Sequence, residues 1–158
     1  MLNFFVTATI SVSLMALISS SAEAADKIVP PNGDHPFTRG SVWKISYVQT
    51  KPGKLDDYLN DAAHVFERYQ EKQKAAGRVL SYKILQLTDA RDNEPNLLLM
   101  IEYPNYAVLD TPDAVWDQGR KELFGNIKGL NTAAVDREAL RTLRGDVYAQ
   151  ELKVPLQK

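Results

Sequence analysis

The chain has no cysteine among its 158 residues and only two histidines. Without cysteine it can form no disulfide, no thiolate nucleophile and no Cys-ligated zinc site. Two histidines leave little material for a Ser-His-Asp triad or a histidine-rich metal site. The sequence also has no glycine-rich phosphate loop, GxSxG elbow or HExxH helix. We therefore expect no metal and no cofactor.

A surplus of either charge is missing as well, with 19 Lys and Arg against 20 Asp and Glu. A balanced chain has no broad basic surface to attract nucleic acid or anionic lipid. We therefore expect that the mature protein has neither nucleic acid nor a membrane as a partner.

No apolar run reaches the ~20 residues that a membrane-spanning helix needs. The run from Phe4 to Ile18 is shorter, is broken by hydroxyl residues and is followed by Ala22-Glu23-Ala24. This order is typical of a secretory signal peptide. The sequence therefore predicts a removable signal at 1–24 and a periplasmic or secreted protein. Because no basic residue precedes the run, an uncleaved anchor or a buried helix is the alternative.

The rest of the chain is long enough for one domain and too short for two. Residues 25–40 contain Pro30-Pro31-Asn32-Gly33 and predict an irregular leader. Residues 41–154 are expected to form the domain, and residues 155–158 a C-terminal tail.

Hydrophobic periodicity predicts the elements of this domain. Alternation predicts a strand from Ser41 to Gln49, and apolar residues at steps of three and four predict a helix from Leu55 to about Ala76. Branched and aromatic residues predict two strands, Val79 to Leu87 and Leu97 to Tyr103, joined by a hairpin.

The second half of the domain repeats the pattern of helix and strand. Thr111-Pro112-Asp113 is typical of a helix start, with Thr111 as the capping residue. A second helical stretch is expected from about Thr132 to Leu143, closed by Gly145, and a last strand from Val147 to Val154. The order strand, helix, strand, strand, helix, strand predicts an α+β fold of the ferredoxin-like type, a four-stranded antiparallel sheet with helices on one face.

The sheet is expected to be apolar on both faces. One set of residues is assigned to the helix side, namely Trp43, Ile45, Tyr47, Leu80, Tyr82, Ile84, Leu99 and Ile101. The opposite face would then carry Val42, Val48, Leu85, Leu87, Leu98, Met100, Val147 and Ala149, together with the charged residues Lys44, Lys83, Glu102 and Glu151. An exposed apolar face of this kind marks an interaction surface. We therefore expect a homodimer, whose interface includes Lys44, Lys83, Met100, Glu102 and Glu151.

From Ser41 to Val154 the chain resembles the dimeric α/β-barrel superfamily, and within it the antibiotic biosynthesis monooxygenase-like domains. The resemblance rests on the element order, on Lys51-Pro52-Gly53-Lys54-Leu55 before the first helix, and on Glu102-Tyr103 at the end of the third strand. It implies a ligand cavity between sheet and helices. Members of the group include cofactor-independent monooxygenases, haem-degrading enzymes and small proteins of unassigned activity. Haem-degrading members carry a histidine on the second long helix, and this chain has none between Pro112 and Leu143, so haem is not expected.

Five aromatic residues are candidates for lining that cavity, namely Trp43, Tyr47, Tyr82, Tyr103 and Trp116. Aromatic walls with a few hydroxyls suit a planar apolar ligand, although a plain aromatic core is the alternative. His64 falls on the polar face of the first helix and His35 in the leader, so neither is expected to have a catalytic role.

Three functions are compatible with this sequence. The first is an exported homodimer that binds a small apolar or aromatic molecule without catalysis. The second is a cofactor-independent monooxygenase or related oxidoreductase with Trp116 and Tyr82 as candidate catalytic residues. The third is a non-catalytic interaction module.

Overall fold

The computed structural model describes residues 35–154, so the predicted signal at 1–24 and tail at 155–158 lie outside the described residues. No helix within residues 35–154 has the length and apolar character needed to cross a membrane. The elements of this part of the chain are β1 (Thr38–Thr50), α1 (Leu55–Ala62), the π-helical turn η1 (Ala63–Glu67), α2 (Arg68–Ala75), β2 (Ser81–Gln86), β3 (Leu97–Tyr103), the 3₁₀ turn η2 (Tyr106–Asp110), α3 (Asp113–Phe124), α4 (Ile127–Glu138) and β4 (Arg141–Lys153).

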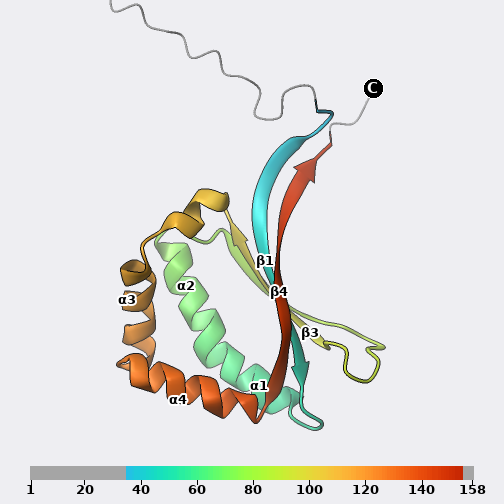
Figure 1. The fold of residues 1–158 in the computed structure, drawn as a ribbon, viewed down its shortest axis with the longest axis vertical. Helices are drawn as coiled ribbons and strands as arrows, with labels where there is room; N and C mark the ends of the chain where they lie inside the picture. Colours follow the sequence, from blue (N-terminus) through green and yellow to red (C-terminus); the bar gives the residue numbers. More distant parts are fainter. Residues whose placement is uncertain (1–34, 155–158) are drawn as a thin grey trace, which may run out of the picture.

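Within residues 35–154, four strands form one antiparallel sheet in the order β2-β3-β1-β4. Figure 1 shows the helices gathered on one side of this sheet, with α1 and α2 running along it and α3 and α4 farther out. The expected α+β architecture with an antiparallel sheet and helices is confirmed. The strands β1 and β4 continue together beyond the helices as a long two-stranded ribbon.

The segments α1, η1 and α2 form one continuous helical run from Leu55 to Ala75. Tyr58 and Ala62, one turn apart, and Gln70 and Gln73 further along the run face inward and are buried, as steps of three and four residues allow on one face of a helix. Gly77 ends the run with φ +72°, a left-handed conformation that glycine adopts without strain.

The assignment of β1 residues to faces is wrong by one residue. Val42 and Val48 are 0% exposed and pack under the helices, opposite Tyr103 and Leu97 of β3. Trp43, Ile45 and Tyr47 therefore point to the other side of the sheet, which no helix covers in the described part of the chain. Since successive side chains alternate, a shift of one residue exchanges the two faces of a strand.

Boundaries near the C-terminus also differ from the expectation. The helix predicted from Thr132 to Leu143 is α4, which begins at Ile127 and ends at Glu138, and β4 begins at Arg141 instead of Val147. At the other end of the domain, Thr38 to Gly40 belong to β1 and not to an irregular leader. Thr111 is not the cap of α3, because Pro112 occupies that position without a side-chain cap.

A β-bulge in β4 explains why this strand was predicted to begin too late. Tyr47 pairs with Gly145 whereas Val48 pairs with Leu143, so Arg144 is an extra residue in the ladder. Gly145 has φ +131°, a backbone conformation that residues other than glycine rarely adopt. The bulge changes the alternation of β4 and places Arg141, Leu143 and Asp146 all on the helix side.

Two groups of buried side chains hold the helices on the sheet. The first consists of Val42, Val79, Ile101 and Tyr103, with Phe66, Val108 and Trp116 packed against it. The second consists of Val48, Tyr58 and Leu97, with Leu55, Leu59, Ile84, Leu99 and Leu140 packed against it. Both groups include residues of β1, β3 and the first helical run, so β1 is the strand on which the helical layer depends.

We expect Val48→Ala to lower the free energy of unfolding by about 2 kcal/mol, because it removes buried methyl groups and leaves a cavity. The matched control is Val154→Ala, the same change at a side chain that is 69% exposed. It should cost well under about 0.5 kcal/mol. Urea unfolding followed by circular dichroism measures both variants. Equal losses of unfolding free energy would contradict the placement of Val48 on the helix side of β1.

Candidate functional site

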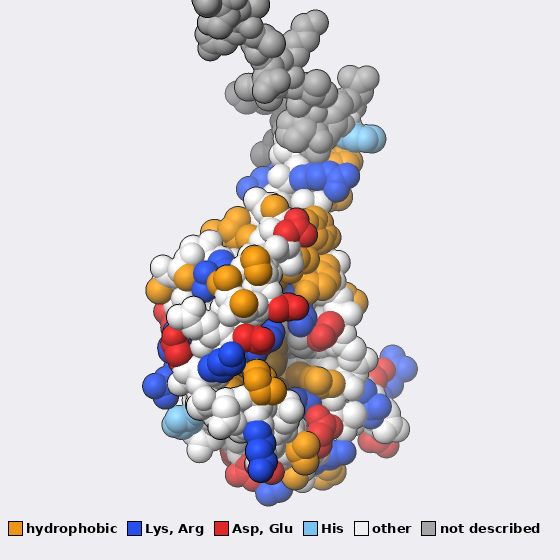
Figure 2. All heavy atoms as spheres, turned by 60° about the vertical axis from the view of Figure 1, so that its left-hand side comes forward, with side chains coloured by type: hydrophobic (Ala, Val, Ile, Leu, Met, Phe, Trp, Pro, Cys, Tyr) orange, Lys and Arg blue, Asp and Glu red, His pale blue; other side chains and the backbone are white. Residues whose placement is uncertain are grey.

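A cavity of about 310 Å³ lies between the helix side of the sheet and the helical layer, and we call it the main pocket. The strands β1, β3 and β4 form its floor, and α1, η1, α2, α3 and α4 supply its walls. Figure 2 shows acidic and basic side chains close together around the hollow between the helices and the sheet. The pocket is lined by Lys44, Ser46, Tyr58, Asp61, Ala62, Val65, Phe66, Tyr69, Gln70, Leu99, Arg120, Leu123, Phe124, Leu130, Arg137, Arg141, Leu143 and Asp146.

Much of this lining is apolar. Phe66 projects from the first helical run, Leu99 from the sheet, and Leu123, Phe124 and Leu130 from α3 and α4. Binding sites for small molecules have apolar walls of this kind with a few polar groups. The main pocket therefore has the size and the surface to enclose part of a small apolar molecule.

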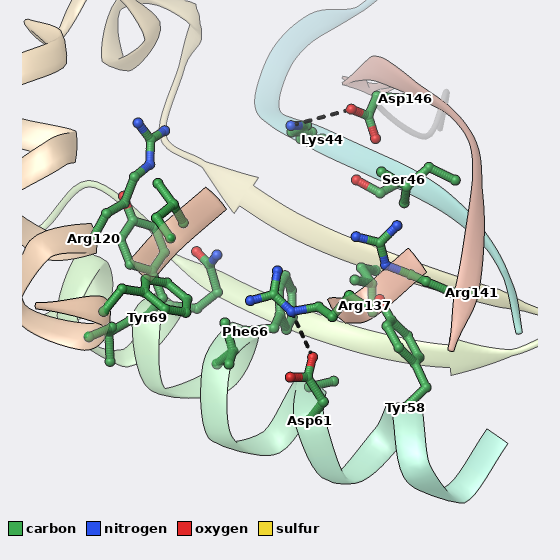
Figure 3. A pocket seen from close by; sticks show the side chains of 18 residues that line it. Lys44, Ser46, Tyr58, Asp61, Phe66, Tyr69, Arg120, Arg137, Arg141 and Asp146 are labelled. Carbon is green, nitrogen blue, oxygen red and sulfur yellow. Dashed lines mark ion pairs between the residues drawn. The ribbon is translucent and has the colours of Figure 1, made fainter. Parts of the chain in front are cut away.

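Two ion pairs lie in the lining of the pocket (Figure 3). Lys44 Nζ of β1 lies 3.5 Å from Asp146 Oδ2 of β4. Arg137 Nε of α4 lies 2.9 Å from Asp61 Oδ2 of α1. The second pair joins the last helix, α4, to the first one, α1, so it helps to close the pocket on the helical side.

The guanidinium of Arg137 is buried but incompletely paired. Its side chain is 15% exposed. The short contact with Asp61 is an ion pair by distance, yet the N–H direction does not make it a hydrogen bond, and Nε and Nη2 have no hydrogen-bond partner among residues 35–154. An ion pair depends on distance alone, whereas a hydrogen bond also requires a favourable N–H direction. The Arg137 guanidinium therefore places a positive charge and an unused hydrogen-bond donor inside the cavity.

Arg141, the first residue of β4, is also buried, with a side chain that is 9% exposed. Its Nη1 donates to Glu138 Oε1 at 3.1 Å, and its guanidinium lies 5.9 Å from the centre of the Tyr58 ring. Burial raises the pKa of Tyr58, while the charge of Arg141 acts in the opposite direction. The phenol of Tyr58 is therefore a neutral hydrogen-bonding group at physiological pH.

A tight connection brings these two arginines together. Only Ala139 and Leu140 separate α4 from β4, and the backbone N–H of Lys51 donates to the Leu140 carbonyl at 2.8 Å. The bulge at Gly145 then places Arg141 on the same side of β4 as Asp146. Two guanidinium groups thus enter one cavity from consecutive elements.

A second cavity of about 340 Å³ adjoins the main pocket and shares Lys44, Tyr69, Gln70 and Arg120 with it. Tyr103 and Trp116 line this second pocket. Trp116 Nε1 donates to the Thr111 carbonyl at 3.1 Å, so the indole is fixed in place. Burial raises the pKa of Tyr103 to about 12.

The five aromatic residues predicted to line one cavity do not all lie there. Tyr103 and Trp116 lie between the sheet and the helices, whereas Trp43 and Tyr47 point to the uncovered side of the sheet. Tyr82 lies on the helix side of the edge strand β2, with its ring packed edge-on against Phe66 at 5.9 Å between ring centres. Its hydroxyl donates to Glu71 at 2.8 Å, and this hydrogen bond raises the pKa of Tyr82 to about 12.

Of the predicted interface residues, Lys83, Met100, Glu102 and Glu151 do lie on the uncovered side of the sheet, but Lys44 lies on the helix side, next to Asp146. Ser81 Oγ donates to Glu102 at 2.5 Å, which lowers the pKa of that carboxyl. We call this uncovered side the open face. Its apolar residues are Trp43, Ile45, Tyr47, Leu85, Leu98, Met100, Val147 and Ala149.

Both histidines lie away from the pockets. His64 is exposed on the helical run, with Nδ1 2.7 Å from the Asn60 carbonyl oxygen, and His35 stacks on Phe37. Within residues 35–154, no three His, Asp or Glu side chains are arranged to hold a metal ion.

The pocket arginines were missed from the sequence, although one signal was present. Arg137 follows Leu130 by seven residues, which places it on the same face of a helix. A basic residue within an apolar stripe suggests a buried charge. Arg141 carried no comparable signal, because its direction depends on the bulge at Gly145.

We expect the buried phenol of Tyr103 to make stability depend on alkaline pH. Its pKa is about 12 in the folded chain and 10 in the unfolded chain, so its contribution is complete below pH 10 and is lost as the pH rises towards 12. Tyr103→Phe should reduce the loss of unfolding free energy between pH 9 and pH 11 by about 1 kcal/mol. Urea titrations at pH 9, 10 and 11 measure the free energy of unfolding of wild type and variant. Tyr106→Phe, at a ring that is 45% exposed, is the control, and a Tyr103→Phe curve that follows wild type would contradict the burial.

No family model matches the chain, and no curated protein matches it significantly. Among solved structures, the chain is similar to the crystal structure of PA3566 from Pseudomonas aeruginosa. The two chains are 15% identical, and the match covers 73% of this chain and 96% of the other, with a TM-score of 0.40.

Proposed function

We propose that the protein binds a small apolar or aromatic molecule between its sheet and its helices. The main pocket supports this proposal, since its wall combines apolar side chains with a few polar groups. The second pocket shares Lys44, Tyr69, Gln70 and Arg120 with it, so Tyr103 and Trp116 lie next to the proposed binding site.

We further propose a ferredoxin-like domain that works as a homodimer of the α/β-barrel type, like the monooxygenase-like domains it resembles. The element order and the sheet order β2-β3-β1-β4 support this assignment. The open face supports it as well. Leu85 and Val147 are 43% and 42% exposed there, and Lys83 Nζ lies 5.1 Å from the centre of the Trp43 ring. A surface this apolar is unfavourable in water unless a second copy covers it.

Export is part of the same proposal and rests on the sequence of the first 24 residues. It predicts that the protein isolated from its native cell envelope or medium begins at or near Ala25. N-terminal sequencing of that material tests this point independently of the fold.

Monooxygenase chemistry is the alternative within the same pockets. Of the two catalytic candidates, Trp116 lines the second pocket and Tyr82 lines neither pocket; the tyrosine that faces the same cavity as Trp116 is Tyr103, which would bring an aromatic substrate next to an indole and a phenol. Oxygen uptake in the presence of a quinol substrate, lost in Trp116→Phe, would favour the enzyme. Saturable binding without turnover favours the ligand-binding protein.

The binding proposal predicts that Leu130→Phe weakens the binding of naphthalene-2-carboxamide by about tenfold or more, because a larger side chain occupies the main pocket. The control is Ile127→Phe in the same helix, at a side chain that is 43% exposed and does not line the main pocket. Isothermal titration calorimetry measures both variants. Equal affinities for the two would place the binding site elsewhere.

The homodimer proposal predicts that Val147→Asp yields the mass of a single chain, because a charge on the open face would be buried at the interface. Val135→Asp makes the same change on α4, at a side chain that is 70% exposed, and should remain dimeric. Light scattering coupled to size-exclusion chromatography gives the mass of each. A wild-type protein that elutes as a single chain at micromolar concentration would refute the dimer.

A further inference from the structure

We infer that the main pocket selects a molecule with one carboxylate, which Arg137 and Arg141 bind while its apolar body lies against the phenylalanine and leucine side chains. This inference rests on the proposed ligand-binding function, because it specifies the chemistry of the ligand.

The positions of the two guanidinium groups are the first observation. Arg137 projects from the last turn of α4 and Arg141 from the first position of β4, and both extend into the cavity above the helix that carries Tyr58 and Phe66 (Figure 3). Their side chains are 15% and 9% exposed. Arginine is almost never buried to this degree unless it is paired.

The second observation is that this pairing is incomplete. Arg141 is held by Glu138 through Nη1. Nε of Arg137 lies 2.9 Å from Asp61 Oδ2, whereas Nη2 of Arg137 is buried with no hydrogen-bond partner among residues 35–154. Buried donors without an acceptor are unfavourable, and a ligand oxygen that reached them would relieve this cost. The unfilled hydrogen-bonding capacity therefore lies inside the cavity and on a cation.

The balance of charge limits the head group of the ligand. Four cationic side chains line the main pocket, and each lies within ion-pair distance of one carboxylate: Lys44 with Asp146, Arg120 with Asp117, Arg137 with Asp61 and Arg141 with Glu138. The pocket thus has no surplus of positive charge that could hold a polyphosphate, and a head group with one negative charge fits it better. Guanidinium groups bind carboxylates through paired N–H donors, which gives them geometric selectivity as well as strength.

The rest of the lining describes the body of the ligand. Phe66, Leu99, Leu123 and Phe124 offer an apolar surface beside the arginines, so a carboxylate on an aromatic ring or a short alkyl chain would satisfy both parts of the pocket. A fully polar anion would leave this surface without a partner, and a neutral apolar molecule would leave the Arg137 donors unpaired.

The test compares naphthalene-2-carboxylate with its neutral amide by isothermal titration calorimetry on the full chain after any signal removal. We expect wild type to bind the carboxylate at least about tenfold more tightly than the amide, as a charge-assisted hydrogen bond allows. Arg137→Gln should bring the two affinities within about twofold by weakening carboxylate binding alone. Arg144→Gln is the matched control: Arg144 donates to Gln49 at the exposed bulge, outside the main pocket, so this variant should keep the preference.

The outcomes separate this inference from the proposed function. Equal binding of the acid and the amide by wild type, or an unchanged preference in Arg137→Gln, would overturn the inference and leave ligand binding intact. Binding of neither compound would overturn both. Circular dichroism and thermal unfolding verify that each variant is folded. Should Arg137→Gln not fold, Arg141→Gln applies the same test to the other guanidinium.

Discussion

The alternation of side chains along β1 determines both surfaces of the sheet. Val42 and Val48 anchor the helical layer, and Lys44 and Ser46 between them face the main pocket. The intervening residues, Trp43, Ile45 and Tyr47, form the centre of the open face. One strand thus contributes to the core, the pocket floor and the open face, so the pocket can be located only once it is known which β1 residues face the helices. Val42 and Val48 show this, because both are fully buried beneath the helical layer.

The main pocket combines two features that oppose each other energetically. Apolar walls lower the local dielectric constant, which makes every buried charge more costly. The protein offsets this cost by placing carboxylates of other elements next to the cations, Asp61 beside Arg137 and Asp146 beside Lys44. These pairs also connect α1 to α4 and β1 to β4, so the charges that a ligand would meet also tie the pocket walls together. A ligand that displaced one of these carboxylates would therefore also weaken a contact between the pocket walls.

Much of the architecture was predictable from the sequence, because a period of two and steps of three and four are strong signals in β1, the first helical run and β3. The phase of β1 was not predictable in the same way. Both of its faces are apolar, and the larger side chains of Trp43 and Tyr47 favoured the wrong one. The beginning of β4 was missed because the bulge at Gly145 interrupts its alternation. Tyr103 lies between sheet and helices, on the same face of β3 as Leu99 and Ile101. Arg137 and Arg141 meet only through tertiary structure, which a single sequence does not reveal.

The ribbon of β1 and β4 has a practical consequence for work with this protein. Thr38 pairs with Lys153, so the chain enters and leaves the described domain side by side, at the tip that points away from the helices (Figure 1). The main pocket, by contrast, lies near the other end of these strands, around Ser46 and Arg141. A tag or a linker joined directly before Thr38 or directly after Lys153 would thus sit far from the main pocket.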